Sequence, residues 1–563
     1  MPLAERRRRQ LTGAGLVIAT LATRLPFATT MLAEFDSVNF AVGTVRYSLE
    51  QVTPHFPGYI LHILFAKLLL LFTSDTNQAF VWISILLSIG SVLYLWRAAA
   101  VLRGERVGLI AASIWLVLPI FWYYGLVATA YEYEAFFASA LLYHGLRLMR
   151  SHTNRVHFFA LVILLSLAGA ARQSSLLLFF PAVMYAALVT RQSAGRILQA
   201  IGVFVLVTGV WVSALFAYCG GVLVYLHAMS AESIYRSQSF LFGNSFTEHL
   251  AIMAKCLVYL GASCFPLILV TLYAAIKYPK RLRAFMIEAR EHESFRMVTI
   301  VAVPALAFYL FIYFMKGGYL LTLMPSIVLA GAVLIDQLSI WHAYDIKTAP
   351  GNALLLTRPI ITRRVLILTF LVAAVSIAWF VTPFPGNDQA SFDRAFAHDA
   401  FGARRSSLPK QPGALRYALD RVLAFTSLQS AREGDVLHST MLRTLRDEAR
   451  KGEITILDTW WHRWEYYYLP GSFSYDIRDY GGRDTIAVGR SIGYLRTMDL
   501  PQVMILPSTS SVLLVIPREH PAFADLAAQV HLERLPISDG LDIWRITDSS
   551  FHLNWKNRVF VKR

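Results

Sequence analysis

Two short motifs follow the first apolar segment of the chain and carry side chains that could do acid–base chemistry. Residues 35–40 read FDSVNF and residues 53–59 read TPHFPGY. A carboxylate such as Asp36 could accept a proton from a hydroxyl or hold a divalent cation beside a phosphate. His55 could hydrogen-bond or bind metal, or it could only shape the proline-bounded turn. A solvated loop with ordinary charges is the alternative, and we favour function here.

A second acidic motif occurs at residues 129–136, which read TAYEYEAF. Glu132 and Glu134 are two residues apart, so they cannot share one helical face. We expect one of them to face a reaction site, favour Glu132 for catalysis, and keep Glu134 as a substrate-binding candidate. Whether such a carboxylate acts as base or holds a cation stays open.

Two isolated cations lie beside small residues. Arg172 occurs in GAARQSS at 169–175, and Lys316 begins KGGYLL at 316–321, which also contains Tyr319. Small residues permit close backbone approach, and a cation beside them suits a bound phosphate. Either cation alone could instead extend to a lipid phosphate at the membrane surface. Together they predict a site for an anionic lipid head group.

The composition requires that these motifs be positioned by membrane-spanning helices. Of 563 residues, 56% are hydrophobic and 16% are charged, with a mean hydropathy of +0.50. This is typical of a polytopic membrane protein. The net charge of +16 is therefore interpreted as basic cytoplasmic loops and not as nucleic-acid binding. The three cysteines predict neither a disulfide framework nor a zinc site.

Apolar runs predict about eleven transmembrane helices. A further segment, 58–73, contains His62 and Lys67 and is interpreted as an interfacial or re-entrant helix. The predicted spans are 11–30, 77–97, 107–125, 133–149, 157–171, 175–190, 197–217, 250–276, 297–315, 319–337 and 364–383.

Charge alternates between the predicted loops. With the N-terminus inside, every inner loop is rich in Arg and Lys, whereas the outer loops carry Glu and Asp. The positive-inside rule then places the motifs around Asp36, Glu132, Arg172 and Lys316 on the outer face. The chain divides into a transmembrane catalytic domain, 1–384, whose first outer loop is 31–76, and an outer C-terminal domain, 385–563.

The C-terminal domain is predicted to be a soluble α/β domain. Strands are expected at 454–459, 503–506, 511–517 and 542–547, and helices at 413–428, 438–451 and 521–528. The aromatic run 460–470 (WWHRWEYYYLP) could stack on a sugar, although a domain core is the commoner role of such a run.

The order of these motifs resembles the GT-C glycosyltransferase superfamily, in particular the protein O-mannosyltransferases and the lipid A aminoarabinose transferase. The resemblance implies an integral membrane enzyme that transfers a sugar from a polyprenyl-phosphate donor to an acceptor. By position it implies that Asp36 serves as base, that Arg172 binds the carrier phosphate, and that Lys316 and Tyr319 line the donor pocket. The usual Asp-Glu pair is Asp36-Ser37 here, which leaves a divalent cation as only a possible cofactor.

The sequence therefore predicts an inverting glycosyltransferase in a bacterial inner membrane, with a cytoplasmic N-terminus and a periplasmic C-terminal domain. Its expected partners are the lipid bilayer, a polyprenyl-phosphate sugar and a glycan, lipid or protein acceptor, and not nucleic acid. A transporter or flippase of a lipid-linked or anionic substrate is the alternative, although no internal repeat of the kind common in transporters is evident.

Overall fold

The computed structural model divides into two compact units, which we describe separately. The first comprises the described residues within Met1–Ala28, Tyr59–Pro383 and Ala414–Leu428, and the second those within Thr29–Gly58, Phe384–Gly413 and Gln429–Arg563. The described residues are 3–236, 246–312, 316–343, 363–382, 426–458, 462–469, 472–476, 485–487, 494–496, 503–516, 523–536, 542–555 and 558–563.

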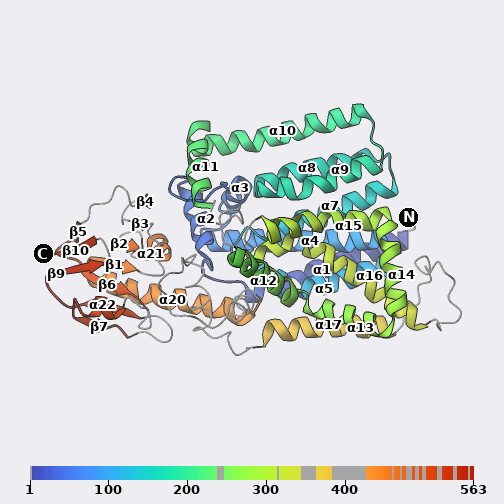
Figure 1. Ribbon diagram of the computed structural model, residues 1–563. Coiled ribbons are helices and arrows are strands. Elements are labelled where there is room, and N and C mark those ends of the chain that lie inside the picture. Colours follow the sequence, from blue (N-terminus) through green and yellow to red (C-terminus); the bar gives the residue numbers. More distant parts are fainter. Residues whose placement is uncertain are drawn as a thin grey trace. The chain divides into compact units, whose positions relative to one another are not determined.

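The described part of the first unit is helical (Figure 1). Its elements in chain order are α1 (Leu3–Arg24), η1 (Leu25–Phe27), α3 (Ile60–Leu69), α4 (Thr76–Arg103), α5 (Glu105–Val117), α6 (Pro119–Tyr124), α7 (Glu132–Arg150), α8 (Arg155–Ala171), α9 (Ser174–Val189), α10 (Ala194–Cys219), α11 (Val222–Arg236), α12 (Phe246–Ser263), α13 (Phe265–Lys277), α14 (Pro279–Glu291), α15 (Glu293–Phe311), η3 (Gly317–Thr322), α16 (Met324–Ala343) and α17 (Arg363–Val381).

Local sequence sets the ends of these helices. The Asp75 side chain accepts a hydrogen bond from the Gln78 N–H at the start of α4 (3.2 Å), which satisfies one of the first free backbone donors. Helix α4 ends at Gly104, whose φ of +96° suits a residue without a side chain. Ser193 caps α10 in the same way, and Gly220 ends it with a φ of +86°.

The eleven predicted spans all overlap helices, but fewer helices could cross a bilayer by length and composition. Among the described residues four helices are long and apolar enough, or five if a pair bent by 79° at Ser263–Phe265 is one span. The difference arises because Pro119 and Pro266 begin new helices within predicted spans, and because several apolar helices are shorter than 18 residues. Helix α3 has ten residues, too few to cross a bilayer.

Helix α4 forms the centre of this bundle. It contacts α5 and α7 closely. Of the most apolar 18-residue stretch of α4, 67% is buried, whereas the corresponding share in α10 is 17%. Ser91 shows why the approach is close: its hydroxyl donates to the Ala135 carbonyl (3.0 Å) and meets the Ser139 hydroxyl (3.0 Å). Figure 1 shows α10 on the outside of the α8–α9 pair. We expect the apolar surface of α10 to face lipid.

The second unit joins the loop residues within Thr29–Gly58 to the C-terminal residues. Helix α2 (Phe35–Val45) comes from the loop. The C-terminal elements are α20 (Leu428–Lys451), β1 (Ile454–Asp458), α21 (His462–Tyr468), β2 (Phe473–Asp476), β3 (Thr485–Ala487), β4 (Tyr494–Arg496), β5 (Val503–Ile505), β6 (Ser511–Val515), α22 (Phe523–Ala527), β7 (Leu532–Arg534), β8 (Ile543–Ile546), β9 (Phe551–Trp555) and β10 (Arg558–Lys562).

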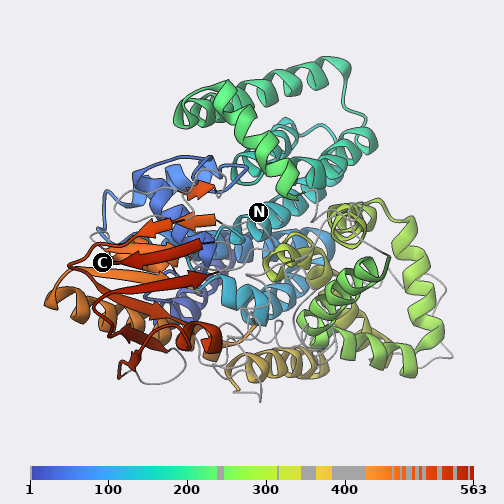
Figure 2. The same ribbon diagram turned by 60° about the vertical axis from the view of Figure 1, so that its left-hand side comes forward.

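A mixed five-stranded sheet, ordered β2-β1-β6-β8-β7, organises this unit (Figure 2). Strand β1 is parallel to β2 and β6, with Ile456 opposite Ser474 and Leu513, whereas β8 is antiparallel to β6 and β7. A three-stranded sheet, β5-β10-β9, and the pair β3-β4 complete the strands. Leu514 and Phe560, both fully buried, belong to one apolar cluster that these strands share.

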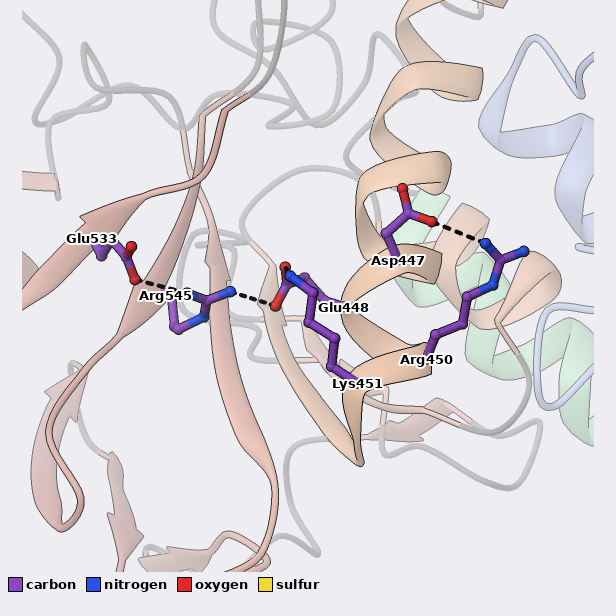
Figure 3. Close-up of polar contacts among 6 residues, drawn as sticks. All are labelled: Asp447, Glu448, Arg450, Lys451, Glu533 and Arg545. Carbon is purple, nitrogen blue, oxygen red and sulfur yellow. Dashed lines mark hydrogen bonds and ion pairs between the residues drawn. The ribbon is translucent and has the colours of Figure 1, made fainter.

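A charged cluster ties α20 to the five-stranded sheet (Figure 3). Arg545 of β8 donates to Glu448 of α20 (2.5 Å) and to Glu533 of β7 (2.7 Å), and Lys451 donates to Glu448 (2.6 Å). Although burial opposes it, hydrogen bonds from Lys451 and Arg545 lower the pKa of the Glu448 carboxyl. This carboxylate therefore stays ionised at neutral pH.

The predicted α/β domain is confirmed in class, with more strands than expected. Four predicted strands correspond to β1, β5, β6 and β8, and the helices predicted at 438–451 and 521–528 correspond to α20 and α22. Most of the helix predicted at 413–428 lies outside the described residues. The other strands have three to five residues and were not predicted.

Candidate active site

Arg172 lies where α8 ends and the chain turns into α9. Its backbone N–H donates to the Ala168 carbonyl (2.8 Å), and its extended backbone (φ −156°, ψ 115°) then leaves the helix. The turn is tight because α9 begins at Ser174. The Arg172 side chain is 11% exposed. The guanidinium is thus held inside the protein and is not extended to lipid.

The Arg172 guanidinium contacts Glu134 of the second acidic motif and Tyr319 of the KGGYLL motif. Its Cζ lies 3.8 Å from the centre of the Tyr319 ring, and its Nη1 lies 3.9 Å from Oε1 of Glu134. A cation over an aromatic face is stabilised by the ring quadrupole, the more so when both are buried. Within the described part of the chain, Nη1 has no hydrogen-bond acceptor.

Hydrogen bonds fix the Glu134 carboxylate beside Arg172. The Ser175 hydroxyl donates to Oε1 (2.7 Å), and the Thr322 hydroxyl donates to Oε2 (3.3 Å). Glu134 is 2% exposed, so leaving its charge without these partners would be costly. Three segments, the starts of α7 and α9 and the end of η3, therefore converge on one acid.

The KGGYLL motif forms the 3-10 helix η3, which begins after Lys316. The Tyr319 ring stacks on Tyr309 at 5.2 Å and 19°, and it meets Tyr131 edge-on at 5.6 Å. A Cβ added to Gly318 would collide with the Tyr131 ring. The glycine is thus required for close packing of η3 against the start of α7, and this packing holds Tyr319 under Arg172.

Glu132 faces a different buried cluster. It is fully buried, and its carboxylate interacts with Arg24 of α1 and with the Ser88 hydroxyl. The structure therefore brings Glu134, and not Glu132, to Arg172. A rotation of about 200° separates residues two apart on a helix, which explains why adjacent acids serve two clusters.

Arg24 was not singled out from the sequence. Its Nη1 donates to the Leu116 carbonyl (2.7 Å), and its guanidinium lies 5.0 Å from the centre of the Phe121 ring. The side chain is fully buried. The available signal was a lone cation inside the first predicted apolar span, because an ionisable residue there is a functional candidate in its own right.

Asp36 and His55 form a pair in the second unit. Asp36 lies in the first turn of α2, which a capping box between Glu34 and Ser37 begins. Nδ1 of His55 lies 3.6 Å from Oδ1 of Asp36, longer than a hydrogen bond, and the His55 ring packs against Phe40 at 5.5 Å. The Asp36 side chain is 18% exposed. It is accessible and has an imidazole beside it.

The predicted site residues thus form three groups. Glu134, Arg172 and Tyr319 are in contact, with Lys316 at the start of the same 3-10 helix. Glu132 belongs to the Arg24 cluster, and Asp36 pairs with His55. In the part of the chain that the structure describes, no three His, Cys, Asp or Glu side chains are placed to hold a metal ion.

Comparison with protein families matches a range that lies mostly in the first unit. Residues 54–218 match the family model described as dolichyl-phosphate-mannose-protein mannosyltransferase. This region contains the second acidic motif and Arg172. A comparison with curated proteins found no match.

Two solved structures share the fold over nearly the whole chain. The crystal structure of ArnT from Cupriavidus metallidurans bound to undecaprenyl phosphate covers 98% of this chain and 99% of its own, with a TM-score of 0.52 and 12% identity. The apo structure of ArnT from the same organism covers 96% and 98%, with a TM-score of 0.51 and 13% identity. At this identity the likeness concerns the fold.

Proposed function

We propose that the chain is a GT-C membrane glycosyltransferase whose donor is a polyprenyl-phosphate sugar, and the family match of residues 54–218 and the fold support this. Both findings agree with the superfamily that the sequence motifs resemble. The acceptor in our proposal is a hydroxyl group of a protein, lipid or cell-envelope glycan. We further propose that transfer takes place on the periplasmic face of a bacterial inner membrane.

One observation carries the proposed donor class. Arg172 is a buried cation whose Nη1 has no acceptor among the described residues, although the Tyr319 ring and Glu134 hold its guanidinium in place. A buried donor without a partner is costly, and a phosphate oxygen would satisfy it. The similar ArnT structure holds undecaprenyl phosphate, which supports the same class of ligand for this chain.

The proposed reaction is a single inverting displacement. The acceptor oxygen bonds to the anomeric carbon while the bond from that carbon to the phosphate oxygen breaks, and the electron pair leaves with the polyprenyl phosphate. Asp36 accepts the proton of the acceptor hydroxyl. Arg172 and Lys316 stabilise the charge on the departing phosphate, and Tyr319 and Glu134 orient Arg172. His55, which lies beside Asp36, is assigned to substrate binding.

Glu132 takes a supporting role in this proposal. Because its carboxylate is fully buried and interacts with Arg24, we assign it to fixing the start of α7 against α1. Glu134 lies two residues further along that helix, so its position depends on the same start.

Labelled-donor transfer tests the proposal directly. Full-length protein in sealed proteoliposomes is incubated with radiolabelled polyprenyl-phosphate sugars and a membrane extract, and product is measured. Labelled product supports transfer, whereas uptake of label into sealed vesicles without product supports the transporter alternative and overturns the proposal.

Matched variants then test the residue roles. We expect Asp36→Asn to lower kcat about 100-fold or more, whereas Glu50→Gln, at an exposed position of the same loop, should have no effect.

Arg172→Ala should lower kcat/KM for the donor about 100-fold. Arg172→Lys should lower it less, because Lys keeps the charge but loses the planar contact with Tyr319. Arg155→Ala, which removes an exposed cation at the opposite end of α8, is the control. Parental rates in Asp36→Asn or Arg172→Ala would refute the assignments.

A further inference from the structure

The segment that leads into α2 is bound by an acid of the C-terminal region. Oδ2 of Asp435, on α20, accepts hydrogen bonds from the backbone N–H (2.5 Å) and the hydroxyl (3.0 Å) of Thr30. Oδ1 accepts from the backbone N–H of Met31 (3.0 Å). Both carboxylate oxygens are therefore used, and two consecutive backbone donors of the loop are satisfied by one side chain.

Helix α21 binds the next residue of the same segment. Nε1 of Trp464 donates to the Leu32 carbonyl (2.6 Å), and the Leu32 N–H donates to the Tyr468 hydroxyl (3.3 Å). Trp464 and Leu32 are fully buried, and the Trp464 indole stacks on His438 at 4.7 Å and 20°. Side chains rigidly packed in this way leave the bound backbone little freedom to shift.

We propose that Asp435, Trp464 and Tyr468 are positioning residues for the first outer loop: they fix the backbone of residues 30–32 and thereby the placement of Asp36. The proposal rests on the role of Asp36 as base in the proposed function. Leu32 is only four residues from Asp36, and the capping box of Glu34 and Ser37 fixes the helix start between them.

The distance dependence of catalysis makes this anchoring consequential. A reacting group displaced by about 1 Å can cost 100-fold in rate. If residues 30–32 were not held by these hydrogen bonds, Asp36 would move by much more than this, because each residue that is not fixed retains its backbone freedom. The C-terminal region thus contributes to the reaction without touching substrate.

The test uses Asp435→Ala in the full-length protein in nanodiscs, with hydrogen–deuterium exchange of a peptide covering residues 29–40. We expect faster exchange in this peptide and a kcat lowered about 10- to 100-fold, with KM for the donor within about twofold of the parent. Asp435→Asn keeps one acceptor oxygen and should give intermediate values of both. Asp447→Ala is the matched control, since Asp447 is exposed on the same helix and pairs with Arg450 (Figure 3); it should change neither.

A double variant separates positioning from a general loss of structure. If Asp435 acts through Asp36, Asp435→Ala should lower the residual rate of Asp36→Asn by less than twofold. A full multiplicative loss in that background would overturn the proposal, as would unchanged exchange, or faster exchange with a parental kcat. Should Asp435→Ala fail to fold, Tyr468→Phe removes only the hydroxyl that accepts from the Leu32 N–H and takes its place in each measurement.

Failure of this proposal and failure of the proposed function give different results. A fully active Asp36→Asn protein would refute the catalytic base, and with it the positioning role, even where exchange shows that Asp435 holds the loop. Normal exchange in Asp435→Ala together with an inactive Asp36→Asn would refute only the positioning role.

Discussion

Substituting Gly318 by alanine tests the packing on which the Arg172 site depends. The added Cβ would lie 2.5 and 2.6 Å from the Cδ atoms of the Tyr131 ring, whereas carbon atoms in contact are about 3.5–4.0 Å apart. The ring would have to retreat by about 1 Å. It is 9% exposed and packs edge-on against Tyr124 at 4.9 Å, so the retreat meets other side chains. Overpacking of this kind costs about 1–3 kcal/mol.

Displacement of the Tyr131 ring should also lower the rate of the reaction. Tyr131 meets the Tyr319 ring, and the Arg172 guanidinium lies on that ring. We therefore expect Gly318→Ala to lower the free energy of unfolding by about 1–3 kcal/mol and donor-dependent kcat/KM by about 10- to 100-fold. Thermal unfolding in detergent and the labelled-donor assay measure the two effects.

A second glycine provides the control. A Cβ at Gly209 of α10 meets nothing within 4 Å, so Gly209→Ala should stabilise its helix by up to about 1 kcal/mol and leave the rate unchanged. Truncating Tyr131 to alanine removes the Cγ and Cδ atoms that collide, so Gly318→Ala should cost less in that background. Parental stability and rate in Gly318→Ala would refute the packing argument.

Three further perturbations test other contacts. Glu134→Ala should cost about 3–5 kcal/mol of unfolding free energy, because it leaves Arg172 buried without its counter-charge; denaturant titration of this variant and of Glu134→Gln, which we expect to lose less, measures the difference. Burial lowers the pKa of His438 to about 3, so the unfolded chain binds its proton first as the pH falls below about 6.5 and the folded state loses about 2 kcal/mol between pH 7 and pH 5. His438→Phe should remove that part of the pH dependence of unfolding, and an unchanged dependence would contradict the buried neutral ring. Arg545→Met should cost about 1–3 kcal/mol, whereas Arg450→Met, at a position 80% exposed, should change the unfolding free energy by less than about 0.5 kcal/mol; equal losses would contradict the role of the charged cluster in Figure 3.

Composition and local patterns predicted the class of the fold because both depend on neighbouring residues. Long apolar runs require helices in a membrane, and α4 and α10 begin within a few residues of the predicted spans. The span predicted at 250–276 is divided into α12 and α13, with Pro266 at the start of α13. The proline was visible in the sequence, but an average over apolar residues does not register it.

The sequence by itself determined which residue types could bind a phosphate or accept a proton, and that Glu132 and Glu134 must face different directions. Only the tertiary structure decided that Glu134 is the acid beside Arg172. That choice depends on which face of α7 is turned toward α9 and η3. The anchoring of Thr30 by Asp435 joins residues 405 positions apart. No local pattern encodes such a contact, since it arises only when the chain has folded and buried donors must find acceptors.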